Sequence, residues 1–148
     1  MSDSMTDTMT REGWRAVEDD GFIDLIGPFW HRVTQAGAEF ALVGQPKHRN
    51  RRGVVQGGAV MTLADRACGT TARETAGVAS VATVQLDVHF VDAALIGAVL
   101  IATPRVVRVT KSLIFMAAEI SAGDRTVATA AGVFKVMRKP PPGAKTQD

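Results

Sequence analysis

The pattern of apolar and polar residues makes the second half of the chain almost entirely β. After Gly77, four stretches have the alternation or apolar content of strands, over residues 81–91, 98–110, 112–121 and 126–137. Tight turns at residue 111 and at residues 122–124 separate the last three, and Pro104 predicts a bulge or an edge within its strand. The first stretch alternates strictly, with Ala82, Val84, Leu86, Val88 and Phe90 on one face and Thr83, Gln85, Asp87 and His89 on the other.

The first half of the chain mixes helices and short strands. The polar start predicts a disordered tail over residues 1–9, and a helix is predicted from Thr10, which can cap it, to Gly21. A short apolar patch over 22–26, with the length of a single helical turn, precedes a hairpin of strands 29–33 and 38–43. A helix over 57–74 follows. The prolines at 140–142 end the predicted domain, which leaves 10–139 as one domain and 140–148 as a flexible tail.

The predicted helix over 57–74 is lined with Ala, Gly, Thr and Cys, and side chains of that size let a sheet approach closely. One curved antiparallel sheet wrapped around one long helix is an α+β architecture. Such a sheet keeps open edges and an uncovered face, which predicts self-association.

Composition narrows the class of protein. With 46% hydrophobic residues the chain is globular, and no apolar run approaches the ~20 residues of a membrane span. The acidic start is unlike a secretory signal, and the single Cys68 excludes an internal disulfide, so a cytoplasmic protein is expected. His31 and His48 are not spaced as metal ligands are, so no metal site is expected. No other cofactor is expected either. Cys68 is interpreted as a core residue.

The net charge is only +2, but basic residues are concentrated in the loop 47–52 and at Arg138 and Lys139. Basic loops beside a cleft suit an anionic small molecule, while solvated loops that aid solubility are the alternative. No nucleic-acid-binding motif accompanies the charge.

The stretch from Asn50 to Asp65 contains most of the residues that are candidates for a catalytic role. Gly57 and Gly58 open the long helix, whose first N–H groups have no partner within the helix and favour negative charge. Asp65 is a single carboxylate on an otherwise apolar helix. The glycines could instead permit tight packing, and Asp65 could instead pair with Arg66 or Arg73.

The stretch reads N-x-x-G-x-x-Q-G-G-x-x-x-x-L-x-D and is followed by the strand V-A-T-V-Q-L-D-V-H-F. This combination resembles the PaaI-type hotdog acyl-CoA thioesterases of the 4-hydroxybenzoyl-CoA thioesterase-like superfamily, over roughly Gly27 to Arg138. The resemblance implies a hotdog fold and hydrolysis of an acyl-CoA to free acid and CoA. The family has His-Gly-Gly where this chain has Gln56-Gly57-Gly58.

The resemblance also implies roles for individual residues. The N–H of Gly57 polarises the thioester carbonyl, and Asp65 attacks that carbonyl or activates water. Asn50 supports the site, although it could be a turn former. Thr83 binds the water or the acid, although it falls on the polar strand face and could reflect strand propensity alone. Substrate-binding candidates are Gly58, Arg51 and Arg52, with Arg138 and Lys139 in reserve for a CoA phosphate.

Helix geometry adds an inference about assembly. Eight residues separate Gly57 from Asp65, which places them about 12 Å apart along one helix. One carbonyl cannot contact both, so the donor and the acid of a site come from two chains if this mechanism holds. A homodimer, or a dimer of dimers, is therefore predicted.

Gln56 leaves a second class of function open. Gln forms hydrogen bonds but does not titrate near neutrality, so a catalytically silent hotdog module that binds acyl-CoA or another metabolite is the alternative. A hotdog hydratase needs an acid and His arrangement that the sequence lacks. Asp87 and His89 are interpreted as solvated or as part of a subunit contact, and no feature identifies the acyl group.

Overall fold

The computed structural model describes residues 2–139 and 141–143. The predicted central helix, the leading hairpin and the four long strands are confirmed, with boundaries close to those expected. The helices are α1 (Ser2–Arg11), α2 (Phe22–Ile26) and α3 (Gly57–Ala76), with a 3-10 turn at Pro46–His48. The strands are β1 (Arg15–Ala16), β2 (Phe29–Thr34), β3 (Gly37–Val43), β4 (Val81–Phe90), β5 (Val99–Val109), β6 (Leu113–Ala122) and β7 (Arg125–Val136).

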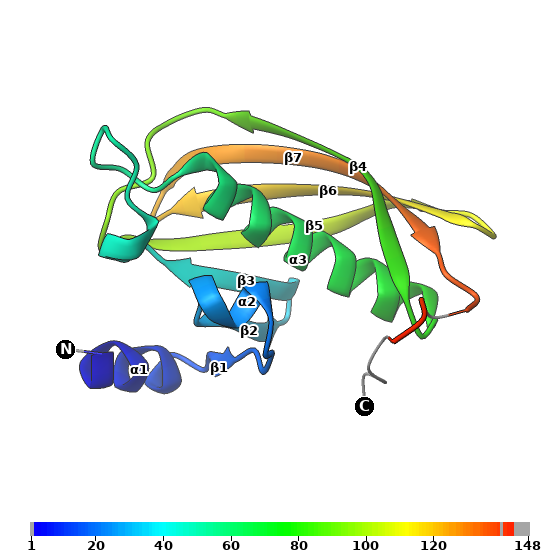
Figure 1. The fold of residues 1–148 in the computed structure, drawn as a ribbon, viewed down its shortest axis with the longest axis horizontal. Coiled ribbons are helices and arrows are strands. Elements are labelled where there is room, and N and C mark those ends of the chain that lie inside the picture. The colour runs from blue at the N-terminus through cyan, green and yellow to red at the C-terminus, as the bar shows by residue number, and fades with distance from the viewer. Residues whose placement is uncertain (1, 140, 144–148) are drawn as a thin grey trace.

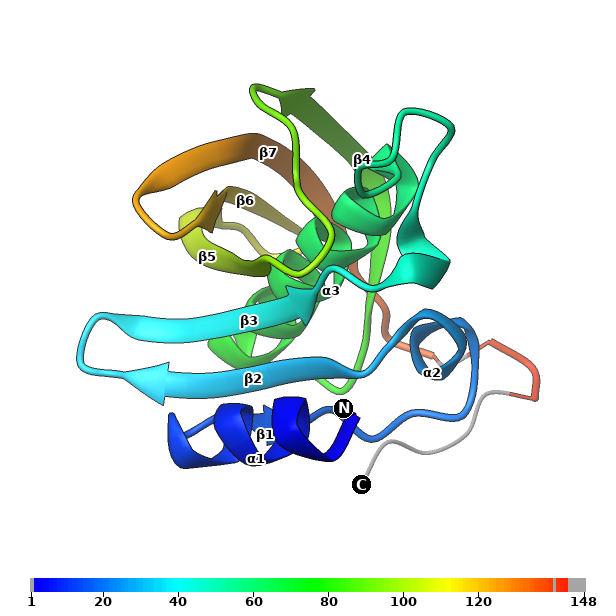
Figure 2. The same cartoon turned by 90° about the vertical axis from the view of Figure 1, so that its left-hand side faces the viewer.

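The strands form one antiparallel sheet in the order β1-β2-β3-β5-β6-β7-β4. The sheet curves around α3, which lies along its concave face (Figures 1 and 2). This is the predicted α+β arrangement of a long helix wrapped by a curved sheet. The order places β4, the strand that directly follows α3 in the chain, at the sheet edge next to β7.

Small side chains allow α3 to sit deep in the sheet. Ala64, Ala67 and Ala72 are completely buried, and the larger Leu63 is buried beside them. The helix ends at Gly77, whose left-handed backbone (φ 66°) allows its N–H to bond the carbonyls of Arg73 and Glu74. One apolar core joins this helix face to the inner residues of the sheet, among them Phe29, Leu42, Leu100, Ile114, Met116, Ile120 and Phe134.

The N-terminus differs from the sequence-based expectation. In place of a disordered tail and a helix from Thr10, the chain forms α1 over Ser2–Arg11 and continues into the short β1. Met5 and Met9, one helical turn apart, pack against Trp14 and Trp30 on the sheet face opposite α3. Two methionines in a polar sequence are too weak a pattern to predict a helix, because its stability comes from this packing.

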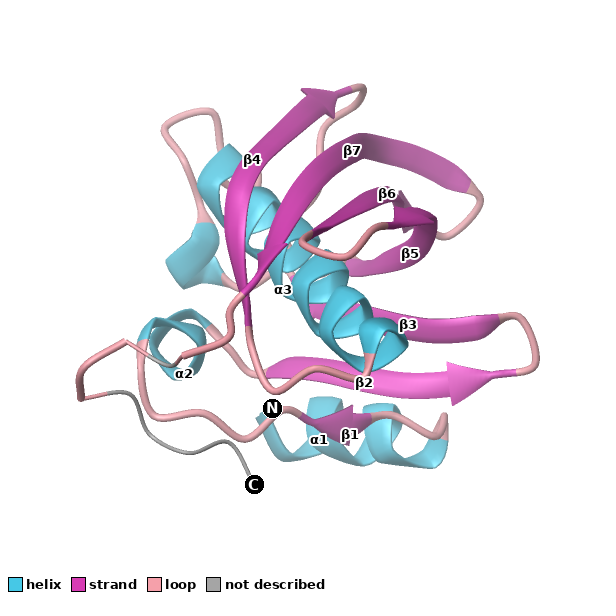
Figure 3. Ribbon diagram, turned by 90° about the vertical axis from the view of Figure 1, so that its right-hand side faces the viewer, coloured by secondary structure: helices cyan, strands magenta, loops and turns pink. Residues whose placement is uncertain are grey.

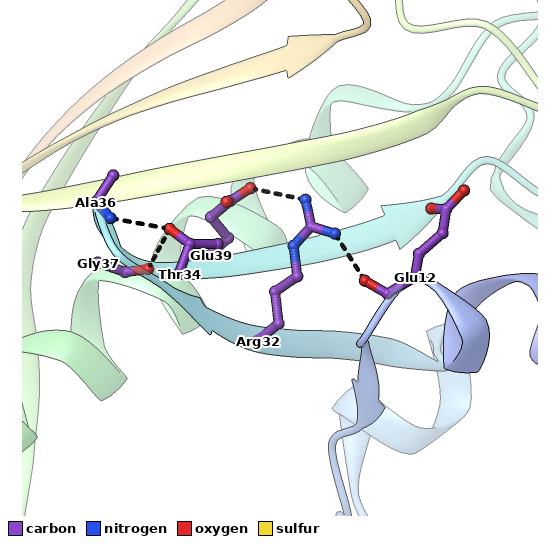
Figure 4. Close-up of polar contacts among 6 residues, drawn as sticks. All are labelled: Glu12, Arg32, Thr34, Ala36, Gly37 and Glu39. Carbon is purple, nitrogen blue, oxygen red and sulfur yellow. Dashed lines mark hydrogen bonds and ion pairs between the residues drawn. The ribbon is translucent and has the colours of Figure 1, made fainter.

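A polar contact fastens the segment after α1 to the sheet. Arg32 on β2 donates to the carbonyl of Glu12 at 3.0 Å and reaches the carboxylate of Glu39 at 3.5 Å (Figure 4). The same guanidinium lies 4.0 Å from the ring centroid of Trp14. A cation over an indole face is attracted to it, so Arg32 joins the N-terminal segment to the hairpin β2–β3.

The expectation for Pro104 is confirmed. It pairs with Ala118 of β6, but β3 pairs with β5 only as far as Ala102, so Pro104 lies where the other side of the strand has no neighbour. A proline has no N–H to donate there, and the locally open edge requires none.

No helix of the described residues is long and apolar enough to cross a membrane. A flexible tail was predicted over 140–148. Residues 140 and 144–148 of that stretch lie outside the residues that the structure describes.

Candidate functional site

Asp65 and Thr83 meet across the interface between α3 and β4. The hydroxyl of Thr83 donates to Oδ1 of Asp65 at 2.6 Å. No ion pair joins Asp65 to Arg66 or Arg73 in the part of the chain described, and Arg66 pairs with Asp19 at 3.3 Å instead. The structure therefore contradicts the alternative in which Asp65 is a helix-face acid paired with either arginine.

A β-bulge explains why Thr83 faces the helix. Strict alternation places Thr83 with Asp87 on the face away from α3, and this part of the prediction is wrong. The pairing of β4 with β7 shifts between Thr83 and Gln85, where Val84 is the extra residue. A bulge reverses which face the residues before it occupy. Thr83 consequently lies opposite the buried Phe134, and Val84 is 60% exposed.

A cleft with a volume of about 200 Å³ opens beside this pair. It continues from Asp65 along α3 toward the C-terminal end of the helix, and β4 forms its second wall. The lining residues are Asp65, Arg66, Gly69, Thr70, Arg73, Ser80, Val81, Thr83 and Phe134. The half-buried carboxylate of Asp65 therefore faces a space into which a small group could enter.

Cys68 supplies no chemistry to this cleft. It is completely buried, as predicted for a core residue. Burial, and secondarily the negative charge of Asp65, raise the pKa of the Cys68 thiol to about 12. A thiol in that state remains protonated at neutral pH, so it is not a nucleophile.

The start of α3 presents two unpaired backbone donors. The carbonyl of Gln56 accepts from the N–H groups of Ala59 and Val60, at 2.9 and 3.4 Å. The N–H groups of Gly57 and Gly58 bond to no described residue. Free N–H groups at the positive end of a twenty-residue helix are suited to stabilising an oxyanion.

The ring of Phe90 covers one side of this donor. A Cβ built on Gly57 would lie 3.1 Å from the ring, so the glycine allows β4 to cross close to the helix start. The packing role proposed for the glycine pair therefore holds for Gly57, together with its free N–H. Sequence analysis placed Phe90 only on the apolar strand face and missed this contact.

The loop before α3 is held largely by its own hydrogen bonds. Oδ1 of Asn50 accepts from the backbone N–H groups of Arg52 and Val54, at 2.9 and 3.2 Å. This is the turn-forming role that the sequence left open for Asn50. It fixes the loop that leads to Gly57, and the side chain does not contact Asp65 or Thr83.

His48 anchors the same loop, a role that sequence analysis missed. Its buried ring accepts from the N–H of Gln45 through Nδ1 at 2.9 Å, and Nε2 lies 2.6 Å from the carbonyl of Ile26. Because Nδ1 accepts, Nε2 carries the proton and donates to Ile26. The carbonyl of His48 also accepts from the N–H of Gln56 at 2.7 Å, so His48 positions the residue that precedes the donor.

The predicted basic residues form two separate groups. Arg51 and Arg52 are exposed in the loop at the N-terminal end of α3. Arg138 and Lys139 follow β7 and lie beside the opposite end of the helix, where the N–H of Met137 bonds the carbonyl of Ser80 (Figure 1). One chain therefore does not bring the two groups together.

Substitution of Gln56 tests whether its side chain contributes to the stability of the loop or to turnover. Its side chain is exposed and bonds to no described residue, so the loop owes its shape to the backbone of Gln56 and to His48. We expect Gln56→Ala to leave the melting temperature unchanged, because exposed side chains without partners contribute little to stability. We propose that the exposed amide instead acts on the bound thioester beside the neighbouring donor, so turnover should fall roughly ten- to a hundredfold. Thermal melts and steady-state kinetics check the two expectations, and Gln56→His should retain activity.

A long helix wrapped by one curved antiparallel sheet is the hotdog fold. Residues 52–129 match the family described as the Thioesterase superfamily, and the chain belongs to that family. The resemblance to PaaI-type thioesterases is thereby confirmed, and the protein is a thioester hydrolase.

Individual proteins of known sequence or structure are also similar to this chain. The chain is 35% identical to "Putative esterase PA0474" of Pseudomonas aeruginosa over 114 residues, which cover 76% of this chain and 85% of the relative. The BH2602 protein of Bacillus halodurans, crystallised with CoA, is 25% identical with a TM-score of 0.73, covering 94% of this chain and 89% of that one. A mutant of the phenylacetic acid degradation protein PaaI of Thermus thermophilus shares the fold, at 18% identity, a TM-score of 0.71 and coverage of 80% and 100%.

Proposed function

We propose that the protein hydrolyses an acyl-CoA thioester to a free acid and CoA. The observation that carries the proposal is the contact of Thr83 with Asp65 at the mouth of a cleft, on a helix whose first N–H groups are free. The CoA in the crystals of the related Bacillus halodurans protein supports the choice of thioester.

In the proposed reaction, Asp65 activates water or attacks the carbonyl carbon itself. Thr83 holds the carboxylate in place, or holds the water beside it. A new C–O bond forms while the carbonyl oxygen gains negative charge, and the N–H of Gly57 stabilises that charge. On the water route the C–S bond then breaks, and the CoA sulfur leaves as the thiol with the proton that Asp65 took from water. On the direct route the C–S bond breaks as an anhydride between Asp65 and the acyl group forms, and the CoA sulfur leaves as the thiolate. A water molecule then hydrolyses the anhydride, which releases the acid, restores Asp65 and supplies the proton of the thiol.

The donor and the acid of one site come from two chains in this proposal. Gly57 and Asp65 both lie on α3, eight positions and therefore about 12 Å apart. The cleft at Asp65 has no contribution from Gly57 of the same chain. A second chain, turned so that the start of its α3 approaches this cleft, would supply the missing donor.

Strand β4 is the surface on which we propose that the second chain docks. β4 pairs only with β7, so its other side is an open edge (Figure 3). Apolar side chains along it and beside the donor are exposed, with Val84 60%, Phe90 53% and Met61 37% accessible. Open edges and exposed apolar surface are both features of subunit contacts. Asp87 and His89, also exposed on β4, would border that contact.

A panel of acyl-CoA substrates tests the function directly. Release of free thiol from at least one acyl-CoA, with multiple turnovers per chain, is the expected result. Binding of acyl-CoA without any thiol release would instead identify a catalytically silent module. The panel should span straight, branched, aryl and carboxylated acyl groups so that a narrow specificity is not missed.

Arg51 and Arg52 are the proposed contacts for the phosphates of CoA, because both are exposed in the loop that leads to the donor. Replacing both by Ala should raise KM roughly tenfold for an acyl-CoA, since each arginine can form charge-assisted hydrogen bonds to phosphate. KM for the matching N-acetylcysteamine thioester, which lacks phosphates, should stay the same. The double variant Arg105→Ala with Arg108→Ala, exposed on β5, is the control. Equal effects on both thioesters would refute the phosphate role.

A further inference from the structure

The cleft beside Asp65 is polar along most of its length. Beyond the acid and Thr83, the polar residues Thr70, Ser80 and Arg73 line it. Apolar contact comes mainly from Val81 and from the ring of Phe134. An alkyl or aryl group in this space would leave polar groups without partners, which is costly for binding.

Gly69 gives the cleft its depth. Asp65, Gly69 and Arg73 recur every four residues and so share one face of α3. A Cβ on Gly69 would lie 3.4 Å from the ring of Phe134, so the absent side chain leaves the ring as the floor between the acid and the arginine. A group that enters beside Asp65 can therefore extend along the helix toward Arg73.

Arg73 differs from the other arginine of the cleft in its partners. Arg66 is engaged by the carboxylate of Asp19 at 3.3 Å. For Arg73, no side-chain hydrogen bond or ion pair to a described residue is found. A half-buried arginine in a cleft, with no ion pair to any described carboxylate, is a site for a planar anion, which its guanidinium can bind through two parallel hydrogen bonds.

We propose that the preferred acyl group carries a carboxylate at its distal end, which Arg73 binds while the thioester lies at Asp65. This inference rests on the proposed function and specifies its substrate class as the thioester of a short dicarboxylic acid. Arg73 and Asp65 are eight residues apart, about 12 Å along the helix, so the two negative groups stay separated. Thr70 and Ser80 can donate to the same carboxylate.

The dimensions favour the acyl carboxylate over a phosphate of CoA. A volume of about 200 Å³ is below the range of roughly 300–1,000 Å³ typical of pockets for larger ligands. It suits a few carbon atoms with a carboxylate, whereas a nucleotide diphosphate is much larger. The exposed Arg51 and Arg52 lie at the other end of the helix and serve the phosphates in the proposed dimer.

The test compares substrates of matched length on two carriers. Succinyl, glutaryl, butyryl and valeryl groups are each presented as CoA and as N-acetylcysteamine thioesters to the wild type, Arg73→Gln, Arg73→Lys and the control Arg108→Gln on the exposed part of β5. In the wild type we expect kcat/KM to be higher for the carboxylated member of each pair. In Arg73→Gln the ratio of carboxylated to plain substrate should fall about ten- to a hundredfold on both carriers. Arg73→Lys should retain part of that ratio.

Several results would overturn the inference. An unchanged ratio in Arg73→Gln would make Arg73 a solvated helix-end residue. A loss shared by all four CoA substrates and absent from all four N-acetylcysteamine substrates would identify a phosphate contact. If no thioester is hydrolysed, the proposed function fails by itself. Calorimetric binding of the non-hydrolysable S-(3-carboxypropyl)-CoA against S-butyl-CoA then tests the carboxylate preference, and equal affinities in the wild type would refute it.

Discussion

Asp65→Asn should abolish nearly all thioester hydrolysis while the fold and the oligomer remain intact. The amide has almost the shape of the carboxylate and can still accept the hydrogen bond that Thr83 donates at 2.6 Å. It has no negative charge, so it can neither take a proton from water nor attack a carbonyl. Loss of a general base typically costs ~10²–10⁴ in rate, and loss of a nucleophile removes that route altogether.

The measurement is kcat for the best acyl-CoA of the panel, with circular dichroism and light scattering as checks on structure. Asp124→Asn is the matched control, because Asp124 is an exposed carboxylate in the turn between β6 and β7, away from the proposed subunit contact. Wild-type turnover in Asp65→Asn would make the acid a structural residue of α3.

Gly57→Pro should lower kcat about a hundred- to a thousandfold by removing one N–H group. Gly57 is the first residue of α3, where proline is tolerated, and Gln56 has φ −59° and ψ 136°, which suit a residue before proline. The new ring contacts Phe90, which lies 3.1 Å from a Cβ at this position. Gly57→Ala is therefore the control, since it adds the same Cβ and keeps the donor. A similar loss in both variants would assign the effect to crowding.

The two inactive variants together test whether the site is shared. If donor and acid come from different chains, a dimer of one Asp65→Asn chain and one Gly57→Pro chain has one intact site. Co-expression in equal amounts should then restore about a quarter of wild-type activity, because half of the dimers are mixed. A site contained within one chain would leave the mixture inactive, and a monomer in light scattering would contradict the shared site independently.

The elements that could be predicted are those whose residues keep one apolar pattern over most of their length. The strand patterns after Gly77 predicted the four long strands, and the small residues over 57–74 accompanied the prediction of α3. The two short apolar stretches over 29–33 and 38–43 predicted the hairpin of β2 and β3. α1 escaped prediction because Met5 and Met9 are stabilised by a tryptophan pair that comes later in the chain. The contacts that make α1 a helix are tertiary, and local pattern does not contain them.

The candidate site was predictable where a residue acts through the backbone or through its position on a helix. Gly57 and Asp65 belong to this group. Thr83 was predicted only through the family resemblance, since alternation placed it on the wrong face. The roles of His48 and Phe90 could not be predicted, because each depends on a contact between segments far apart in the sequence.

The extra residue at Val84 shifts the alternation of β4 by one position for every residue that precedes it. Residues after Val84 face the side of the sheet that strict alternation predicts, and residues before it face the opposite side. A homologue whose strand lacks the insertion would keep a hydroxyl on the acid only if that hydroxyl stood one position nearer to the equivalent of Phe90. An alignment of this family that places the gap before Thr83, or that has no gap in the strand, would therefore pair Thr83 with a residue that faces away from the acid.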